Sequence, residues 1–429
     1  MWVECTVSHL DKNGFGRCKE HKGIRIQNAI LSETVRAVKL HGDLFLAKQV
    51  VKESEHRVKP KCEYFNLCGG CRWQHMDYNY QLRLKIGIIR QLFNMEPTEI
   101  IPSPSIFNYR GKMEYTFGGE KNNIKLGFNL IGRFDVVVNI NKCEIQPGEF
   151  NKIINEVREF VKSRKLEPYN KITHKGFLRY LILRKGFFTS QLLLNIITTS
   201  KDNFPLLDLR DNLSLKIKSM SWSINDSFGD FARGEIESII GESYIEERIN
   251  NKVFLIGPYT FFQANPLLAG KMANIVSNKA EEGETAVDIY SGIGLFAIHL
   301  ADKFENVIAI ESEKESIKLG LKSSARNNIS NIKFIEGLAE RVLSKEIKKY
   351  GKIDVIVVDP PRAGLHRNVI RSIIRSKPKK IIYVSCNPYT AKKDIQYLKA
   401  ARYDISYIAL IDQFPHTPHI EIISVLERI

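Results

Sequence analysis

Three of the seven cysteines lie close together in the stretch KCEYFNLCGGCRWQH. Cys62, Cys68 and Cys71 follow a Cys-x5-Cys-x2-Cys spacing, which is typical of a metal site that takes its fourth ligand from elsewhere. Two residues can supply that ligand. His75 would complete a local zinc knuckle, and Cys143 in NINKCEIQ would complete a site of four thiolates. Four thiolates hold either structural zinc or an iron–sulfur cluster, and the spacing alone does not separate these two.

A second group of chemically active residues surrounds the glycine turn of VDIYSGIGLFAIHL. Gly292 and Gly294 follow an apolar strand and open a helix, as in a turn that approaches a nucleotide-like cofactor. Asp288 precedes the glycines, and Glu311 ends the next strand, where it can accept hydrogen bonds from ribose hydroxyls. S-adenosylmethionine has no pyrophosphate that these acids would repel. The pattern therefore favours this methyl donor over NAD(P), and a purely structural turn is the third interpretation.

Two further apolar strands end in DPPRAG and SCNP, with Asp359 and Cys386 at their carboxyl ends. Ligands of an open α/β sheet bind outside these ends. A cysteine there suits methylation of carbon 5 of uracil, because a thiolate that adds to carbon 6 turns carbon 5 into a nucleophile. The alternative is that Cys386 is only a small buried apolar residue.

The same reaction needs a base that removes the proton from carbon 5 after methyl transfer. The segment FPHTPHIEIISV supplies three candidates, His416, His419 and Glu421, at the start of the last strand. Glu421 opens an otherwise apolar strand, which is an unfavourable place for an acid without a function. Its alternative interpretation is a solvated charge at the edge of the sheet.

The last third of the chain contains the strands that must carry these residues. TAVDIY, NVIAIE, NIKFIEG, IDVIVVDPP and KIIYVSCNP are nearly continuous apolar runs, separated by helical segments such as 314–328. This alternation predicts a doubly wound, mostly parallel sheet. The strands at 403–414 and 420–429 are joined by a loop too short for a crossover, so we expect an antiparallel pair at one edge.

The first 55 residues show five short strands with glycine-bearing turns, which predicts a small β-barrel of the oligonucleotide-binding (OB) type. An amphipathic helix at 78–95 and a mixed region of strands with one helix at 149–165 follow, up to about residue 250. We therefore predict a multidomain α/β protein whose helix at 78–95 is free to pack on the catalytic domain. The expected units are a barrel at 1–57, an α+β middle domain at 58–252 and a catalytic domain at 253–429.

The composition favours a polyanionic partner. The chain has 64 Lys and Arg against 48 Asp and Glu, a net charge of +16, and such an excess is typical of nucleic-acid binding. No apolar run is long enough for a membrane span, and the first residues lack the layout of a signal peptide. We expect a cytoplasmic protein with reduced, metal-bound or catalytic cysteines and no disulfides. Cys5 and Cys18 are expected to be small core or surface residues of the barrel.

Nearly the whole chain resembles one family, the RNA uracil-5-methyltransferases that carry an N-terminal TRAM domain and an iron–sulfur cluster. The shared motifs are CEYFNLCGGC, YRGKMEYTFG, VNINKCEIQ, LRYLILRKG, FFQANP, DIYSGIGLF, DPPRAG, SCNP and HIEIISVL. DPPRAG, SCNP and the terminal His-x-Glu, in that order, are the most specific of these. The resemblance implies an OB-like TRAM barrel, an α+β middle domain with the cluster, and a C-terminal Rossmann-like class I methyltransferase domain.

The resemblance also implies roles for individual residues. It makes Cys386 the nucleophile and Glu421 the base, and it places Gln263, Tyr290, Glu311 and Asp359 around the cofactor and the target base. It favours Cys143 over His75 as the fourth cluster ligand, and a [4Fe-4S] cluster over zinc. The chain departs from its relatives at Leu295 and Leu338, which stand where polar residues are often found near the cofactor.

We therefore expect S-adenosylmethionine-dependent methylation of carbon 5 of a uridine in structured RNA, by a monomer that flips the base out of its stack. Ribosomal RNA is favoured over transfer RNA as the substrate, and the sequence does not specify the uridine. One alternative is an RNA-binding or assembly protein with a degenerate methyltransferase fold, against which the intact Cys386, Asp359 and Glu421 argue. The other alternative is methylation of cytosine at carbon 5, or of an exocyclic amine.

Overall fold

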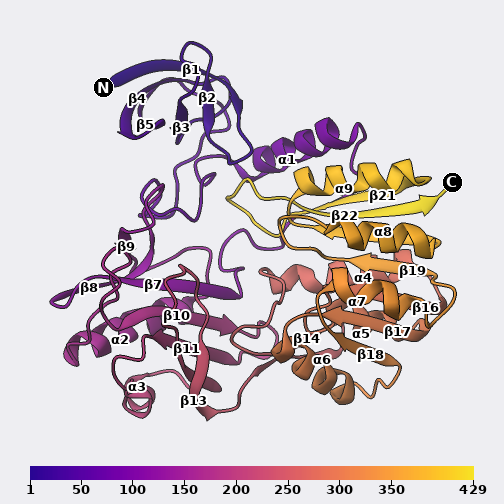
Figure 1. Ribbon diagram of the computed structural model, residues 1–429. Coiled ribbons are helices and arrows are strands. Elements are labelled where there is room, and N and C mark those ends of the chain that lie inside the picture. The colour runs from indigo at the N-terminus through magenta and orange to yellow at the C-terminus, as the bar shows by residue number, and fades with distance from the viewer.

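The computed structural model describes residues 1–429, arranged as a small barrel and two larger α/β bodies (Figure 1). The five barrel strands close in the order β1-β2-β3-β5-β4 around a small apolar core. This confirms the predicted OB-like barrel. Its strands are β1 (Trp2–Leu10), β2 (Gly16–Cys18), β3 (Arg25–Gln27), β4 (Thr34–His41) and β5 (Leu44–Lys52).

The barrel corrects the prediction that the chain forms no disulfides. Cys5 and Cys18 are bonded to each other. They lie on the antiparallel strands β1 and β2, and their Cα atoms are 5.5 Å apart, which is within the usual range for a disulfide. Both residues belong to the barrel core, as expected for small apolar side chains. The pairing of β1 with β2 therefore brings Cys5 and Cys18 within bonding distance. The expectation of reduced cysteines came from the expected cytoplasmic location and did not include this contact.

The middle body is a seven-stranded sheet in the order β13-β12-β11-β10-β7-β8-β9, covered on one face by α2 and α3. Helix α2 buries Ile153, Ile154, Val157 and Val161 against this sheet, which explains its apolar periodicity. The elements are β7 (Lys112–Glu120), β8 (Asn123–Asn129), β9 (Val137–Asn139), α2 (Gly148–Ser163), β10 (Leu178–Lys185), β11 (Leu192–Thr198), α3 (Leu206–Asn212), β12 (Ser219–Ile224) and β13 (Glu235–Gly241).

The third body is an eight-stranded sheet in the order β18-β17-β16-β19-β20-β22-β21-β6, with helices on both faces. Its central strands are buried on both sides, as their continuous apolar runs predict. The elements from residue 266 on are α4 (Pro266–Ala280), β16 (Gly283–Ile289), α5 (Leu295–Leu300), β17 (Phe304–Glu311), α6 (Lys314–Arg326), β18 (Ile332–Glu336), α7 (Ala339–Ile347), β19 (Val355–Val358), α8 (Arg367–Ser376), β20 (Lys380–Ser385), α9 (Pro388–Ala400), β21 (Tyr403–Ile411) and β22 (Glu421–Arg428).

The edge of this sheet differs from the prediction in one strand. β21 and β22 do form an antiparallel pair, but β6 (Glu99–Ile101) adds to β21 in parallel and becomes the outer strand. Helix α1 (Tyr78–Phe93), just before β6, lies beside α9 and β21, and its Ile89 joins the catalytic core. The segment from α1 to β6 is therefore part of the catalytic body in space.

A hairpin joins the middle and catalytic bodies. Its strands, β14 (Ile245–Ile249) and β15 (Lys252–Ile256), span the predicted domain boundary between residues 252 and 253. β15 packs against α6 of the catalytic body, and Phe254 is buried in that body's core. No helix of the protein combines the length and the apolar character that crossing a membrane requires.

Candidate active site

The strand order of the catalytic sheet reverses between β16 and β19. The chain runs from β16 outward to β18 on one side, and then returns to β19 and β20 on the other. Ligands bind at such a switch point, outside the carboxyl ends of the strands. Asp288 ends β16, and Asp359 follows β19 directly beside it, with its N–H donating to the carbonyl of Ile289 at 3.3 Å. Both predicted acids therefore meet at the switch point.

The turn after β16 has the backbone of a cofactor-binding loop. Tyr290, Gly292 and Gly294 have φ angles of 65°, 56° and 88°, in the left-handed region that side chains disfavour. The N–H of Gly292 donates to Glu311 Oε2 at 2.9 Å. Glu311 ends the neighbouring strand β17, and its carboxylate thus joins the turn to that strand. Its Oε1 already accepts the N–H groups of Ser312 and Glu313, so Oε2 keeps the lone pair that a ribose hydroxyl could use.

The side chain of Asp288 is buried beneath the turn and forms a hydrogen bond with the helix that follows it. It is fully buried and accepts the N–H of Ala297 at 3.0 Å through Oδ2, while Oδ1 has no partner within the protein. The Ser291 hydroxyl is also buried without a partner. Burial raises the pKa of Asp288 to about 8, and the charges of Asp359 and Glu311 act in the same direction. Unpaired buried polar atoms beside a positive-φ turn fit a polar cofactor that completes their hydrogen bonds.

A small cavity of about 10 Å³ lies against this turn. Gln263, predicted from the FFQANP motif, reaches it and donates from Nε2 to Asp359 Oδ2 at 3.4 Å. Gln413 fixes Gln263 by donating to its Oε1 at 3.1 Å. Tyr290 and Leu295 also line the cavity, whereas Leu338 is 42% exposed before α7. Leu295 thus gives the cavity an apolar wall.

Cys386 and Glu421 face each other across two paired strands. β20 and β22 are antiparallel with Ser385 opposite Ile422, so the next pair in this register is Cys386 with Glu421. Glu421 is buried, and the Cys386 thiol borders a separate cavity with about 850 Å³ of empty space. The structure therefore brings together a thiol and a carboxyl that the sequence separates by 35 positions.

The charged groups around Cys386 act on the pKa of its thiol in opposite directions. The pKa of this thiol is raised to about 11, by burial first and by the charges of Glu421 and Asp359 second, while Arg362 acts in the opposite direction. Burial also raises the pKa of Asp359 to about 7. The pKa of Glu421 lies well above its usual range, because of burial first and the charge of Asp359 second. Perturbed groups of this kind gather at catalytic sites more often than elsewhere.

The two histidines near Glu421 are placed differently. His419 borders the Cys386 cavity, and burial lowers its pKa to about 3. His416 faces away from that cavity and contacts helix α1, where its Nδ1 lies 3.2 Å from Gln81 Nε2. Burial lowers the pKa of His416 to about 4. Both rings are therefore neutral near pH 7, and the carboxyl of Glu421 is the group best placed to act as a base.

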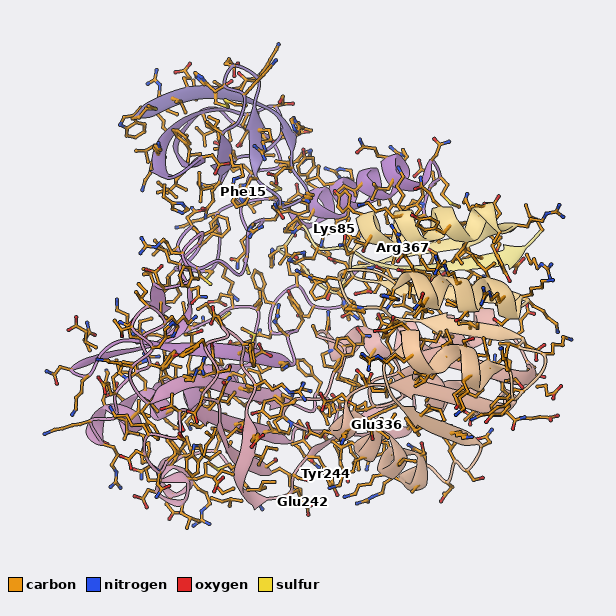
Figure 2. All side chains as sticks on the ribbon, in the orientation of Figure 1. Phe15, Lys85, Glu242, Tyr244, Glu336 and Arg367 are labelled. Carbon is orange, nitrogen blue, oxygen red and sulfur yellow. A yellow bond between two sulfur atoms is a disulfide. The ribbon has the colours of Figure 1, made fainter.

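Sequence reasoning missed the residues that hold this loop. Lys85 on α1 is completely buried, and its Nζ donates to Asp412 Oδ1 at 2.6 Å and to the carbonyl of Phe414 at 3.1 Å (Figure 2). Gln81, one turn earlier, accepts the N–H of His416 at 2.8 Å. One sequence feature could have indicated these residues. Gln81 and Lys85 are polar, four positions apart and within the apolar face of that helix, where a buried polar side chain needs a partner.

The four predicted cluster cysteines, Cys62, Cys68, Cys71 and Cys143, line one cavity with about 1400 Å³ of empty space. His75 does not reach this cavity, because its Nε2 lies 3.3 Å from the carbonyl of Ala29 in the barrel. Burial raises the pKa of Cys68, Cys71 and Cys143 to about 12. These thiols therefore ionise readily only when a cation binds them.

The sulfur atoms of the four cysteines are not gathered tightly around one point. No three of these thiols have Sγ atoms that all lie within 4.8 Å of one another. A single zinc ion at about 2.3 Å from each sulfur would hold all four sulfurs roughly 3.8 Å apart. A cluster binds each thiolate through a different iron atom and spaces them more widely. Four thiols that share one cavity are candidate ligands for a metal ion or an iron–sulfur cluster.

A doubly wound sheet with acids at its switch point and a positive-φ turn without a phosphate cradle defines a class I S-adenosylmethionine-dependent methyltransferase. The family model described as tRNA (uracil-5-)-methyltransferase matches residues 232–429. The tRNA (uracil(54)-C(5))-methyltransferases of Pyrococcus horikoshii and Pyrococcus abyssi are each 35% identical to the chain. The first match covers 88% of both proteins, and the second covers 98% of this chain and 99% of its relative.

A solved structure agrees with these sequence matches. The crystal structure of the Pyrococcus abyssi enzyme in complex with S-adenosyl-L-homocysteine has a TM-score of 0.81 and 31% identity, and the match covers 99% of this chain and all of that one. The chain therefore belongs to the RNA uracil-5-methyltransferase family, whose members methylate carbon 5 of uracil with S-adenosylmethionine as the donor. The family predicted from the motifs is confirmed.

Proposed function

We propose that the protein transfers a methyl group from S-adenosylmethionine to carbon 5 of a uridine in transfer RNA, through a covalent bond between Cys386 and carbon 6. The observation that carries this proposal is the pair of Cys386 and Glu421, opposite each other on β20 and β22 and beside Asp359 at the switch point. A methyltransferase that acts on an exocyclic amine would not need this combination of a thiol and a facing base, whereas methylation of cytosine at carbon 5 would use the same pair and is separated by the labelling test below. A protein that only binds RNA would need neither group.

In the proposed reaction the Cys386 thiol first loses its proton to solvent in the cavity that it lines, and its sulfur bonds to carbon 6 of the flipped uracil. The electron pair of the 5,6 double bond moves to carbon 5 and the carbonyl at carbon 4, and carbon 5 then takes the methyl group that the bound cofactor supplies. Glu421 removes the remaining proton from carbon 5. The double bond re-forms, the bond between sulfur and carbon 6 breaks, and the thiolate is released.

The residues around the pocket divide the remaining tasks. Gln263 and Asp359 are joined by a hydrogen bond and stand between the cofactor turn and the Cys386 pair, where both the donor and the uracil ring must meet. Tyr290, Asp288 and Glu311 would hold the cofactor. Because the raised pKa of Glu421 makes its ionised form a stronger base than an ordinary glutamate, it suits removal of a proton from carbon.

We assign Cys62, Cys68, Cys71 and Cys143 to a [4Fe-4S] cluster. The shared cavity of the four cysteines and the resemblance of their two motifs to the cluster-bearing family support this assignment over zinc. The cluster would tie the segment around residue 70 to the loop before α2. Its contribution here is structural, and no step of the proposed reaction passes through it.

Transfer RNA is the proposed substrate because the two Pyrococcus relatives are named for it. This reverses the sequence-based preference for ribosomal RNA, which the matches do not support. The uridine at position 54 is the first one to test, following the same names. All of the proposed groups come from one chain, which is consistent with an active monomer. We also propose that the chain has the three predicted domains, the barrel, the middle domain and the catalytic domain. The one change is that α1, β6 and the β14–β15 hairpin belong to the catalytic domain and not to the middle domain.

The direct test uses transfer RNA labelled with tritium at carbon 5 of uridine, incubated with the purified protein and S-adenosylmethionine. We expect release of tritium to water in equal amount to methyl incorporation, and mass mapping to locate the methyl group. Transfer RNA labelled at carbon 5 of cytidine is the control and should release nothing. Methyl incorporation without tritium release from uridine would contradict the proposal.

A further inference from the structure

The loop between β1 and β2 of the barrel is held in one shape by its own atoms. Asp11 Oδ1 accepts the N–H groups of Asn13 at 2.9 Å and Phe15 at 3.1 Å. The N–H of Gly14 donates to the carbonyl of Asp11 at 2.8 Å, and Gly14 has a φ of 81°. The loop is therefore a rigid turn that projects Lys12 and Asn13 at its tip.

This turn is docked on two segments of the rest of the protein. Arg72 Nη1 donates to the carbonyl of Asn13 at 2.6 Å, and Trp73 Nε1 donates to the carbonyl of Gly14 at 3.2 Å. A Cβ atom on Gly14 would lie 2.7 Å from Trp73 Nε1 and 3.0 Å from Cγ of Pro418. The backbone of the turn thus touches both the segment after Cys71 and the segment before Glu421.

Phe15 anchors the base of the turn. It is buried at the side of the barrel that faces the other two bodies (Figure 2), where it packs against Ile131 of the middle body. The guanidinium groups of Arg25 and Arg72 lie 5.2 Å and 4.7 Å from the centre of its ring. These contacts fix the position of the turn relative to the catalytic body.

The docked tip forms one wall of the cavity in which the Cys386 thiol lies. Lys12 and Asn13 line this cavity from the barrel, and Arg362 and Lys393 line it from the catalytic body. No aspartate or glutamate is among its lining residues. None of the three cations forms an ion pair within the protein, although 28 such pairs occur elsewhere. Arg362 lies close enough to the buried Glu421 to affect its pKa, whereas Lys12 and Lys393 have no ion-pair partner, and these two free lysines at one cavity favour an anionic ligand.

We propose that this cavity contains a binding site for an RNA phosphate group, with Lys12 of the barrel and Lys393 of α9 as its ligands. The inference rests on the proposed function, because a uridine whose carbon 6 reaches Cys386 must bring its own backbone into the same cavity. The phosphate is that of the target nucleotide or of its direct neighbour. The barrel is then a wall of the active site, and it recognises RNA at the reacting nucleotide as well as at a distance.

The rigid turn explains why a lysine on a separate domain can serve this purpose. A long side chain on a mobile loop would lose much conformational entropy when it binds a phosphate. The turn carrying Lys12 is ordered before RNA binds, so that only the side chain itself must be fixed. Asn13 adds a neutral side chain beside Lys12, and it can donate a hydrogen bond to the same oxygen atoms.

The test measures binding of unmodified transfer RNA at several salt concentrations, together with steady-state methylation. In the variants Lys12→Ala and Lys393→Ala we expect the dissociation constant to rise roughly tenfold at low salt. The slope of its logarithm against the logarithm of salt concentration should decrease by about 0.7 to 1. KM should rise with little change in kcat. Lys22→Ala in the barrel and Lys392→Ala on α9 are matched controls outside the cavity and should keep the wild-type slope.

Gly14→Val provides a second variant that keeps every charge. Its side chain would push the turn away from Trp73 and Pro418, and we expect the same loss of RNA affinity as in Lys12→Ala. Wild-type salt slopes in both lysine variants, or equal effects in the controls, would overturn the phosphate site. If the wild-type protein binds RNA but does not methylate it, the proposed function fails, and the salt slopes still decide the phosphate site.

Discussion

The protein contains two kinds of half-buried thiol, the four cluster cysteines and the solitary Cys386. Burial raises the pKa of Cys143 to about 12 and that of Cys386 to about 11, so burial alone does not distinguish them. Their neighbours do. The cluster thiols face one another in a shared cavity, whereas Cys386 faces Glu421, Asp359 and Arg362. Several thiols in one cavity suit the binding of a cation, whereas a thiol beside a base and a guanidinium suits the making and breaking of a covalent bond to a substrate.

The comparison is tested most strongly by Cys386→Ala. Because no other group can add to carbon 6, we expect methylation to fall by more than roughly a thousandfold. RNA binding, cofactor binding and the melting temperature should stay at wild-type values, since the side chain is small. Transfer of a radioactive methyl group measures the methylation activity, and calorimetric titration measures the binding of RNA and cofactor. Measurable turnover in this variant would place the covalent chemistry elsewhere.

Glu421→Gln separates the two halves of the reaction at Cys386. The amide cannot take the proton from carbon 5, so we expect one methyl transfer followed by a stalled covalent adduct between protein and RNA. Turnover should drop by roughly a hundredfold to ten-thousandfold. The adduct is read as a shifted band on a denaturing gel, and it should be absent in the double variant with Cys386→Ala. A variant that turns over without an adduct would show that another base acts.

Cys143→Ser tests the other side of the comparison. We expect the loss of one thiolate to abolish the visible absorbance of the cluster and to lower the melting temperature by about 5 °C or more. His75→Ala is the matched control, because His75 is the alternative ligand, and it should keep the absorbance. If His75→Ala removed the metal and Cys143→Ser retained it, the four-thiolate site would be wrong.

Asp359→Asn gives the smallest expected effect and probes charge alone. The carboxylate of Asp359 raises the pKa of Cys386, so its removal should lower that pKa and increase the thiolate fraction at pH 8. A decrease of about half a unit to one unit would speed alkylation of Cys386 by roughly three- to tenfold. The rate of iodoacetamide labelling from pH 7 to 10 measures this, with Cys386→Ala as the blank. An unchanged profile would mean that Asp359 is neutral in the free protein over this range.

Short sequence patterns predicted most of the helices and strands, and they predicted where the strands of the catalytic sheet end. The apolar runs fixed the parallel strands, and a carboxyl-terminal position was enough to indicate Asp359 and Cys386 as neighbours of a ligand. The Cys-x5-Cys-x2-Cys spacing was likewise visible because its residues are close in the chain. Each of these signals is local, and the physical rule that interprets it needs no knowledge of distant segments.

The missed features depend on contacts between distant segments. β6 has only three residues and no periodicity, and it becomes a strand because β21 offers an open edge. The position of Lys12 beside Cys386 follows from the docking of a whole domain. The disulfide between Cys5 and Cys18 follows from the register of two short strands, and the argument from compartment pointed the other way.

The buried ion pair of Lys85 and Asp412 has a consequence for the order of folding. The two residues are 327 positions apart. While the chain is being synthesised, α1 therefore exists without the partner of its buried ammonium group until the last strand pair has been made. Such long-range closure is slow and leaves apolar surface open in the meantime. A chain that stops before residue 412 should thus expose α1 to protease, and the helix should become protected only as the final strands take their places in the sheet.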